Sequence, residues 1–116
     1  MRPGTPISDL FRVGVDTVRA SGIPNFQRHH AGHGIGLEMY EAPLLNVSPM
    51  PASPPTSDSA ACLQAGMVLN IELPYYEWGV GGLQIEETLV VRDGGYELLT
   101  TASRDLRPPG SGLVAR

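Results

Sequence analysis

The sequence predicts an α+β fold in which one helix covers an antiparallel sheet. An amphipathic stretch at residues 5–22 carries apolar side chains at three- and four-residue steps, as a helix that covers a sheet would. Two β-type runs, at 67–73 and 83–91, are separated by a glycine-rich turn at 79–82. Because the connection is short, the two runs are expected to pair antiparallel, within one folded unit.

The helix of residues 5–22 has recognisable start and stop signals. Thr5 or Ser8 is the expected cap, and Gly22 stops the helix before Pro24. The apolar face that should pack on the sheet consists of Ile7, Leu10, Phe11, Val15 and Val18.

The rest of the chain is divided by glycine and proline. Residues 46–61 hold several prolines and serines without a hydrophobic period, which predicts a loop insertion. A further short strand is expected at 96–99. We therefore assign 1–107 to one domain and 108–116, rich in glycine and proline near its start, to a flexible tail.

Charge and composition exclude several classes of function. The formal net charge of −4 provides no basic surface for nucleic acid, so no nucleic-acid partner is expected. No apolar run approaches the roughly 20 residues that cross a bilayer, so no membrane partner is expected either. Cys62 is the single cysteine, which rules out an internal disulfide and favours a cytoplasmic location.

Both β-type runs place a glutamate among polar neighbours on one face. Alternation puts Asn70 and Glu72 on one side of the first run, and Gln84, Glu86 and Thr88 on one side of the second. Two facing carboxylates repel each other and are costly to bury, so a cation is expected between them. The alternative is that both glutamates lie on a solvated sheet face.

The three histidines are concentrated in five positions. His29, His30 and His33 lie beside glycines that allow the backbone to approach a ligand closely. One histidine with several carboxylates suits Mn, Zn or Co, and two such ions can share a hydrolytic site. The alternative is that the histidines merely solvate a loop.

Four strings of residues, in order, resemble the second half of the pita-bread hydrolases. They are the strings at 29–37 (HHAGHGIGL), 41–43 (EAP), 65–74 (AGMVLNIELP) and 85–91 (IEETLVV). This family includes Xaa-Pro dipeptidase, aminopeptidase P, methionine aminopeptidase and creatinase. The resemblance implies the pita-bread fold, with this chain forming the C-terminal portion of the catalytic domain.

The resemblance also implies a role for each matching residue. His33 is similar to the histidine ligand of the metal site, Glu72 to a glutamate ligand that also handles the proton of the attacking water, and Glu86 to the glutamate that bridges two metals. His29 matches a catalytic, substrate-binding histidine that stabilises the reacting carbonyl or shuttles a proton. His30 has no implied role and is interpreted as a loop residue.

The implied activity is hydrolysis of a small peptide or related amide by two divalent ions, Mn, Co or Zn. Glu72 and His29 are the implied catalytic residues. The two aspartate ligands of the family lie upstream of the segment that this chain matches, so the site is expected to be incomplete here. A homodimer stays open for the intact protein.

Tyr40 departs from the family pattern. It lies seven residues after His33, where relatives usually carry a histidine, and is expected to contact the substrate. A phenol can donate one hydrogen bond but is not a cation at neutral pH, so specificity for proline is open.

Two other functions compete with a metal-dependent hydrolase. One is a pita-bread domain that binds peptides or proteins without catalysis. The other is a creatinase-like hydrolase that works without metal. Retention of His33, Glu72 and Glu86 argues against both.

Overall fold

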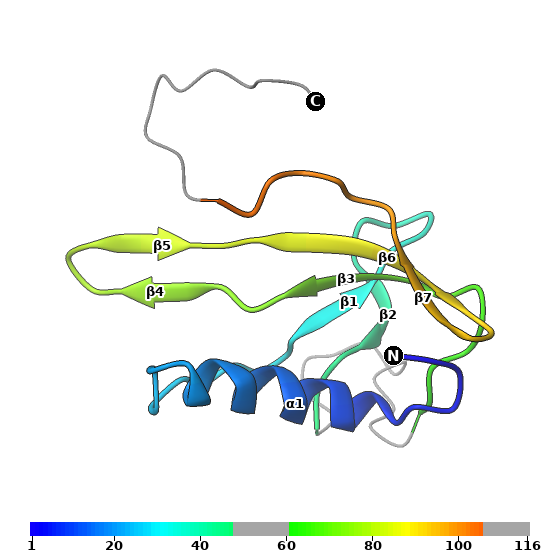
Figure 1. Ribbon diagram of the computed structural model, residues 1–116, viewed down its shortest axis with the longest axis horizontal. Helices are drawn as coiled ribbons and strands as arrows, with labels where there is room; N and C mark the ends of the chain where they lie inside the picture. The colour runs from blue at the N-terminus through cyan, green and yellow to red at the C-terminus, as the bar shows by residue number, and fades with distance from the viewer. Residues whose placement is uncertain (48–60, 106–116) are drawn as a thin grey trace.

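The computed structural model describes residues 1–47 and 61–105 of the chain. A five-stranded antiparallel sheet lies over a single helix, and a two-stranded hairpin extends beyond one end of the sheet (Figure 1). The elements in chain order are α1 (Ile7–Ala20), β1 (Gly32–Gly34), β2 (Glu41–Leu44), β3 (Val68–Glu72), β4 (Tyr75–Glu77), β5 (Gly81–Leu83), β6 (Glu86–Arg92) and β7 (Gly95–Leu98). The α+β class predicted from the sequence is confirmed.

The sheet is built from strands far apart in the chain. Its order is β2-β1-β3-β6-β7, with every neighbouring pair antiparallel. The central pair, β3 with β6, has a continuous register from Val68 opposite Val90 to Glu72 opposite Glu86. This pairing confirms the predicted antiparallel partnership of the two β-type runs.

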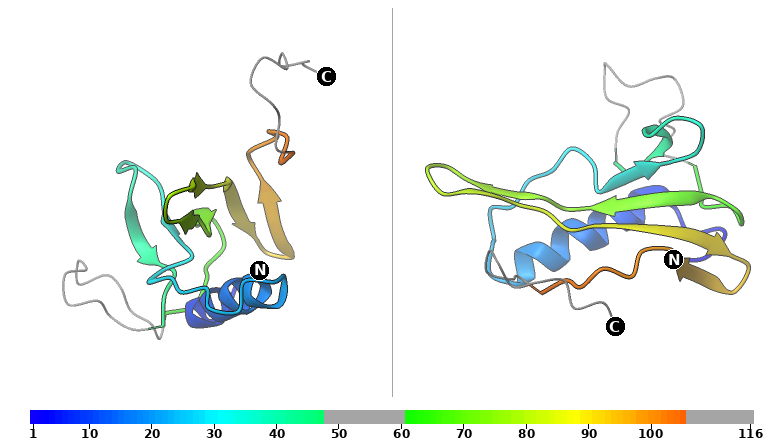
Figure 2. Two further views of the ribbon diagram at one scale, coloured as in Figure 1. Left: turned by 90° about the vertical axis from the view of Figure 1, so that its left-hand side faces the viewer. Right: turned by 90° about the horizontal axis from the view of Figure 1, so that it is seen from above.

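The helix packs on one face of this sheet and leaves the other face free, as two views at right angles show (Figure 2). Ile7 and Val15 are buried, whereas Arg12 and Asp16 on the other side of the helix are exposed. The close approach of helix and sheet occurs at Gly14, which lacks the side chain that would meet Leu73. The predicted apolar face is therefore the packed face.

The start of the helix differs from the prediction. Neither Thr5 nor Ser8 caps it; the helix begins after Pro6, and no side chain caps the first turn. The backbone N–H of Ile7 instead donates to the carbonyl of Ala61, 3.0 Å away. A distant segment therefore satisfies a group that a side-chain cap would otherwise serve.

The core lies between the helix and the strands. Its centre is formed by fully buried aliphatic side chains of five segments: Ile7, Leu45, Leu63, Leu69, Leu89 and Val91. Burying each of these side chains contributes about 1.5–3 kcal/mol. Leu69 and Leu89 belong to this face of β3 and β6, so the polar residues that alternate with them face away from the helix.

The second β-type run is not the single strand predicted for 83–91. It is split between β5 and β6, because Leu83 pairs with Tyr75 in the separate hairpin while Glu86 pairs with Glu72 in the main sheet. Strands β1, β2, β4 and β5 were not predicted. They have three or four residues each, too few to show a hydrophobic period.

Two predicted segments lie outside the described residues. The loop predicted at 46–61 is described only at its ends, and the tail predicted at 108–116 is not described. Within the described part of the chain, no helix has the length and apolar character needed to cross a membrane.

Candidate metal centre

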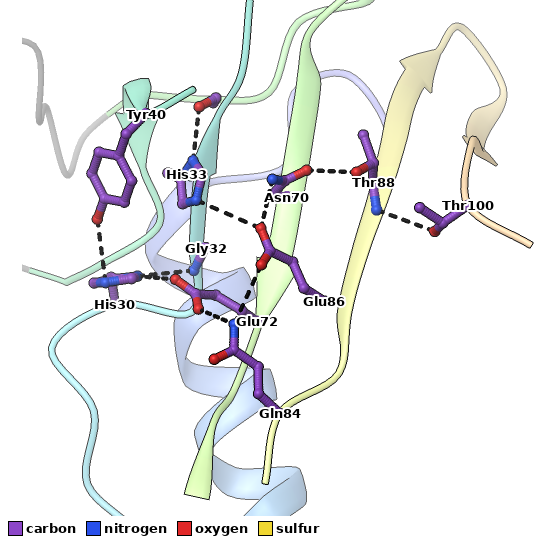
Figure 3. A network of polar contacts seen from close by, with 11 residues as sticks. His30, Gly32, His33, Tyr40, Asn70, Glu72, Gln84, Glu86, Thr88 and Thr100 are labelled. Carbon is purple, nitrogen blue, oxygen red and sulfur yellow. Dashed lines mark hydrogen bonds and ion pairs between the residues drawn. The ribbon is translucent and has the colours of Figure 1, made fainter. Parts of the chain in front are cut away.

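The register of three strands brings the predicted metal ligands onto the face opposite the helix. Glu72 of β3 lies directly opposite Glu86 of β6, and one pair further along Asn70 lies opposite Thr88. His33 of β1 lies opposite Asn70 on the other side of β3. Figure 3 shows their side chains projecting from the same face of the sheet, with the helix behind it.

The two glutamates are joined by the side chain of Gln84. Its amide nitrogen donates to Glu72 Oε2 at 2.9 Å and to Glu86 Oε2 at 3.3 Å. Like charges in this arrangement repel, and a neutral amide offers them only two hydrogen bonds. The cation that the sequence predicts between the two carboxylates stays a prediction.

Asn70 and Thr88 hold one of these carboxylates in place. Asn70 Nδ2 donates to Glu86 Oε1 at 2.6 Å, and its own Oδ1 accepts from the Thr88 hydroxyl at 2.7 Å. The chain of donors fixes which way the Asn70 amide faces, because its nitrogen must point to the carboxylate. Groups of this kind generally orient metal ligands.

His33 is buried and ordered by the backbone. Its side chain is 6% exposed, and Nδ1 lies 2.9 Å from the carbonyl oxygen of Gly34. A hydrogen bond from Nδ1–H to this carbonyl leaves the lone pair of Nε2 free to bind a cation. Nε2 lies 3.9 Å from Glu86 Oε1, so the two groups face the same small space.

Glycines on both sides of His33 allow this close assembly. A Cβ on Gly32, whose φ is +143°, would lie 2.0 Å from the carbonyl oxygen of Asn70. A Cβ on Gly34 would lie 2.2 Å from the carbonyl oxygen of Ala42. Both glycines are therefore required for β1 to pair with its two neighbours.

His30 is the residue that the sequence interpretation missed. It lies in a loop, as predicted, but it is buried: it is 6% exposed, and its Nδ1 lies 3.6 Å from Glu72 Oε1. Burial, and then the nearby charges of His29, Arg28 and His33, lower its pKa to about 4. The imidazole of His30 is therefore neutral at pH 7. The burial of His30 could not be predicted from the sequence, because its neighbour Ala31 adds no apolar periodicity to this segment.

Tyr40 reaches the site from the segment before β2. Its ring stacks on His33, with centroids 4.0 Å apart and an interplanar angle of 29°. Its hydroxyl oxygen lies 3.2 Å from His30 Nε2. Burial, together with the charge of Glu72, raises the pKa of this phenol, so it stays protonated at neutral pH.

His29 lies at the edge of this assembly. It is exposed, and its ring meets His30 edge to face at a centroid distance of 4.4 Å. Its predicted catalytic and substrate-binding role stays a prediction.

The donor set suits a divalent metal ion but forms only part of a coordination shell. An imidazole nitrogen and two carboxylates are ligands that Mn, Co and Zn accept. Among residues 1–47 and 61–105, however, no three His, Cys, Asp or Glu side chains gather closely enough to hold an ion. The donor types of His33, Glu72 and Glu86 therefore suit a metal ion, but the described residues do not by themselves assemble a metal site, and the ligand assignment stays a prediction.

The antiparallel sheet and its covering helix have the α+β arrangement of the pita-bread fold. Residues 1–93 match the model of metallopeptidase family M24, and the chain belongs to that family. Membership implies a dependence on divalent metal ions, and the fold class and family expected from the sequence are confirmed.

Relatives and solved structures agree with this assignment. An uncharacterized peptidase of Staphylococcus haemolyticus is 35% identical over 100 residues, which cover 86% of this chain and 26% of the relative. The X-Pro aminopeptidase of Thermotoga maritima superposes with a TM-score of 0.73 at 31% identity, covering 90% of this chain and 27% of that chain. The prolidase of Pyrococcus furiosus superposes with a TM-score of 0.72 at 29% identity, covering 89% of this chain and 28% of that chain. The chain thus spans about a quarter of the length of the curated relative.

Proposed function

We propose that the chain is the C-terminal portion of a metal-dependent hydrolase of peptide or related amide bonds, similar to Xaa-Pro peptidases. The observation that carries this proposal is the direct opposition of Glu72 and Glu86 beside the Nε2 atom of His33. Two like charges held this closely are stabilised by a cation. Membership of a metallopeptidase family supports a divalent ion in that place.

In this proposal His33, Glu72 and Glu86 are metal ligands, and Glu72 also takes the proton of the attacking water. Two divalent ions, with Mn, Co and Zn as the candidates, would supply a water of lowered pKa and a Lewis acid for the carbonyl. Asn70 fixes the orientation of Glu86, and the Gly34 carbonyl fixes the ring of His33. The remaining ligands would come from the upstream half that the relatives possess.

Substrate contacts are assigned to His29 and Tyr40. His29 is exposed at the edge of the site, where its ring meets that of His30. Tyr40 is half-exposed and can donate one hydrogen bond. We propose a small peptide or amide as substrate, a cytoplasmic location, and no nucleic-acid or membrane partner.

A non-catalytic peptide-binding domain is the competing function. Such a domain has no need of two opposed glutamates, whose repulsion costs stability unless a cation is bound. A metal-free hydrolase has no need of them either. The opposition of Glu72 and Glu86 beside His33 therefore favours the metal-dependent hydrolase.

Calorimetric titration with Mn²⁺ tests the proposal. The chain alone would be compared with a fusion in which the part of the Staphylococcus haemolyticus relative upstream of the matched segment precedes it. We expect the fusion to bind about two ions and to hydrolyse dipeptides, with Ala-Pro and Ala-Ala compared for proline preference. Glu86→Gln should abolish both properties, whereas Glu97→Gln on β7 should preserve them. Metal-independent hydrolysis, or peptide binding that survives both chelator and Glu86→Gln, would contradict the proposal.

A further inference from the structure

His30 is a buried polar side chain to which the chemistry proposed above gives no task. Three groups surround its two ring nitrogens. The Gly32 backbone nitrogen lies 3.3 Å from Nδ1, Glu72 Oε1 lies 3.6 Å from Nδ1, and the Tyr40 hydroxyl lies 3.2 Å from Nε2 (Figure 3). Each nitrogen of His30 therefore has a defined neighbour.

These contacts determine which nitrogen of His30 carries the proton. A backbone N–H can only donate, so Nδ1 must accept from Gly32 and is unprotonated. The carboxylate of Glu72, at 3.6 Å, is beyond hydrogen-bonding distance and does not compete. A neutral imidazole has one N–H, which must then be on Nε2.

The protonation of His30 in turn determines what the Tyr40 hydroxyl does. Nε2–H donates to the phenolic oxygen, so the hydroxyl proton of Tyr40 has to point elsewhere. Stacking on His33 fixes the plane of the ring, and the residue is 50% exposed. In the described part of the chain, the hydroxyl has no other hydrogen-bond partner.

We propose that His30 is a positioning residue that aims the hydroxyl proton of Tyr40 at the carbonyl oxygen of an amide bound beside His33. The inference rests on the proposed function, and deepens it by assigning Tyr40 as a neutral hydrogen-bond donor to the reacting carbonyl. A merely structural His30 would fill space and accept from Gly32, with no effect on the direction of the Tyr40 proton.

Nitrogen NMR of the ¹⁵N-labelled chain tests the tautomer directly. Long-range proton–nitrogen correlations distinguish an imidazole protonated on Nε2 from one protonated on Nδ1. The signals of His30 are identified by their loss in His30→Gln, with His29→Gln as the control at the neighbouring, exposed position. We expect the Nε2–H form at pH 7. The Nδ1–H form would overturn the proposal, because the Tyr40 proton would then be donated to His30.

Three variants of the metal-binding fusion test the consequence for turnover of Ala-Pro. Tyr40→Phe keeps the ring on His33 but removes the donor, and should lower kcat about 100-fold, as loss of one oxyanion donor does. His30→Asn keeps an acceptor for Gly32 but removes the donor to Tyr40, and should lower kcat nearly as much. His30→Gln restores a donor at the position of Nε2 and should keep most of the turnover. KM should change little in all three.

Failure of this inference is distinguishable from failure of the proposed function. If the unsubstituted fusion binds no Mn²⁺ and hydrolyses nothing, both the proposed function and the role of His30 and Tyr40 are overturned. If the fusion is active but Tyr40→Phe turns over normally, only the role of Tyr40 is overturned. If His30→Asn and His30→Gln lose the same turnover and the same thermal stability, His30 is structural.

Discussion

Replacement of Glu86 by glutamine is expected to stabilise the metal-free chain and to abolish the stabilisation that bound Mn²⁺ provides. Gln84 Nε2 lies 2.9 Å from one oxygen of Glu72 and 3.3 Å from one of Glu86, so these oxygens are no more than about 6 Å apart. At an effective dielectric constant of about 20, two charges at this separation repel by about 3 kcal/mol. The Glu86 side chain is 38% exposed, and solvent screening reduces this figure to about 1 kcal/mol.

Urea unfolding in EDTA measures this effect. Glutamine retains an oxygen that accepts from Asn70. Its amide nitrogen faces Gln84 and cannot accept from it, but the exposed Gln84 side chain can bond to water instead, so removal of the charge is the main change. We expect the free energy of unfolding to rise by about 1 kcal/mol, with an unchanged slope against urea. Glu97→Gln is the matched control and should lose a few tenths of a kcal/mol, because Glu97 pairs with Arg92 on the surface.

Urea unfolding with Mn²⁺ in place of EDTA should make the unsubstituted protein more stable than Glu86→Gln. In the metal-binding fusion, bound ion should stabilise the unsubstituted protein by about 2.7 kcal/mol at a concentration 100 times the Kd, and should not stabilise Glu86→Gln. If Glu86→Gln is less stable than the unsubstituted chain in EDTA, the two carboxylates do not repel as argued. Equal stabilisation of both proteins by Mn²⁺ would remove Glu86 from the ligand set.

Three further predictions concern packing, the hydrogen bond from Asn70 to Glu86, and pH. Gly32→Ala should destabilise the chain by about 1–3 kcal/mol or prevent folding, because the new Cβ would lie 2.0 Å from the Asn70 carbonyl oxygen. A Cβ on Gly94 would meet nothing within 4 Å, so Gly94→Ala is the control and should be neutral. Thermal melts of the two variants measure the difference. Asn70→Ala should cost about 1–3 kcal/mol in urea unfolding because Glu86 loses its 2.6 Å donor, and equal stability would refute this. His30 has a folded pKa of about 4, below the ordinary 6.5, so the unfolded chain binds more protons between these values, and stability should fall by up to about 3 kcal/mol as pH falls from 6.5 to 4. His30→Gln, measured by urea unfolding across that range, should have a flatter profile.

The sheet shows how far a hydrophobic pattern predicts structure. The central strands β3 and β6 alternate apolar and polar residues, so their pairing and the shared face of Glu72 and Glu86 were predictable. Strand β1 consists of Gly-His-Gly, which has no strand propensity. It becomes a strand because Gly32 and Gly34 allow its backbone to approach both neighbours. Tertiary pairing, not local preference, makes this strand.

The start of the helix shows the same division. The apolar period predicted the packed face, with Ile7 and Val15 buried as expected. The predicted cap at Thr5 or Ser8 was wrong, because the backbone N–H of Ile7 donates to the carbonyl of Ala61, a residue more than fifty positions away. A short-range capping rule contains no information about such a partner.

The sequence by itself determined the family and the packed face of the helix, because motifs and apolar periodicity are recorded locally along the chain. The metal-ligand roles of His33, Glu72 and Glu86 are what the family resemblance implies and stay a prediction. Only the tertiary structure decided that His30 is buried, that Gln84 joins the two glutamates, and that Tyr40 lies on His33. Each of these depends on distances between segments that are remote in sequence, and such distances are set by the packing of the whole sheet rather than by the residues themselves.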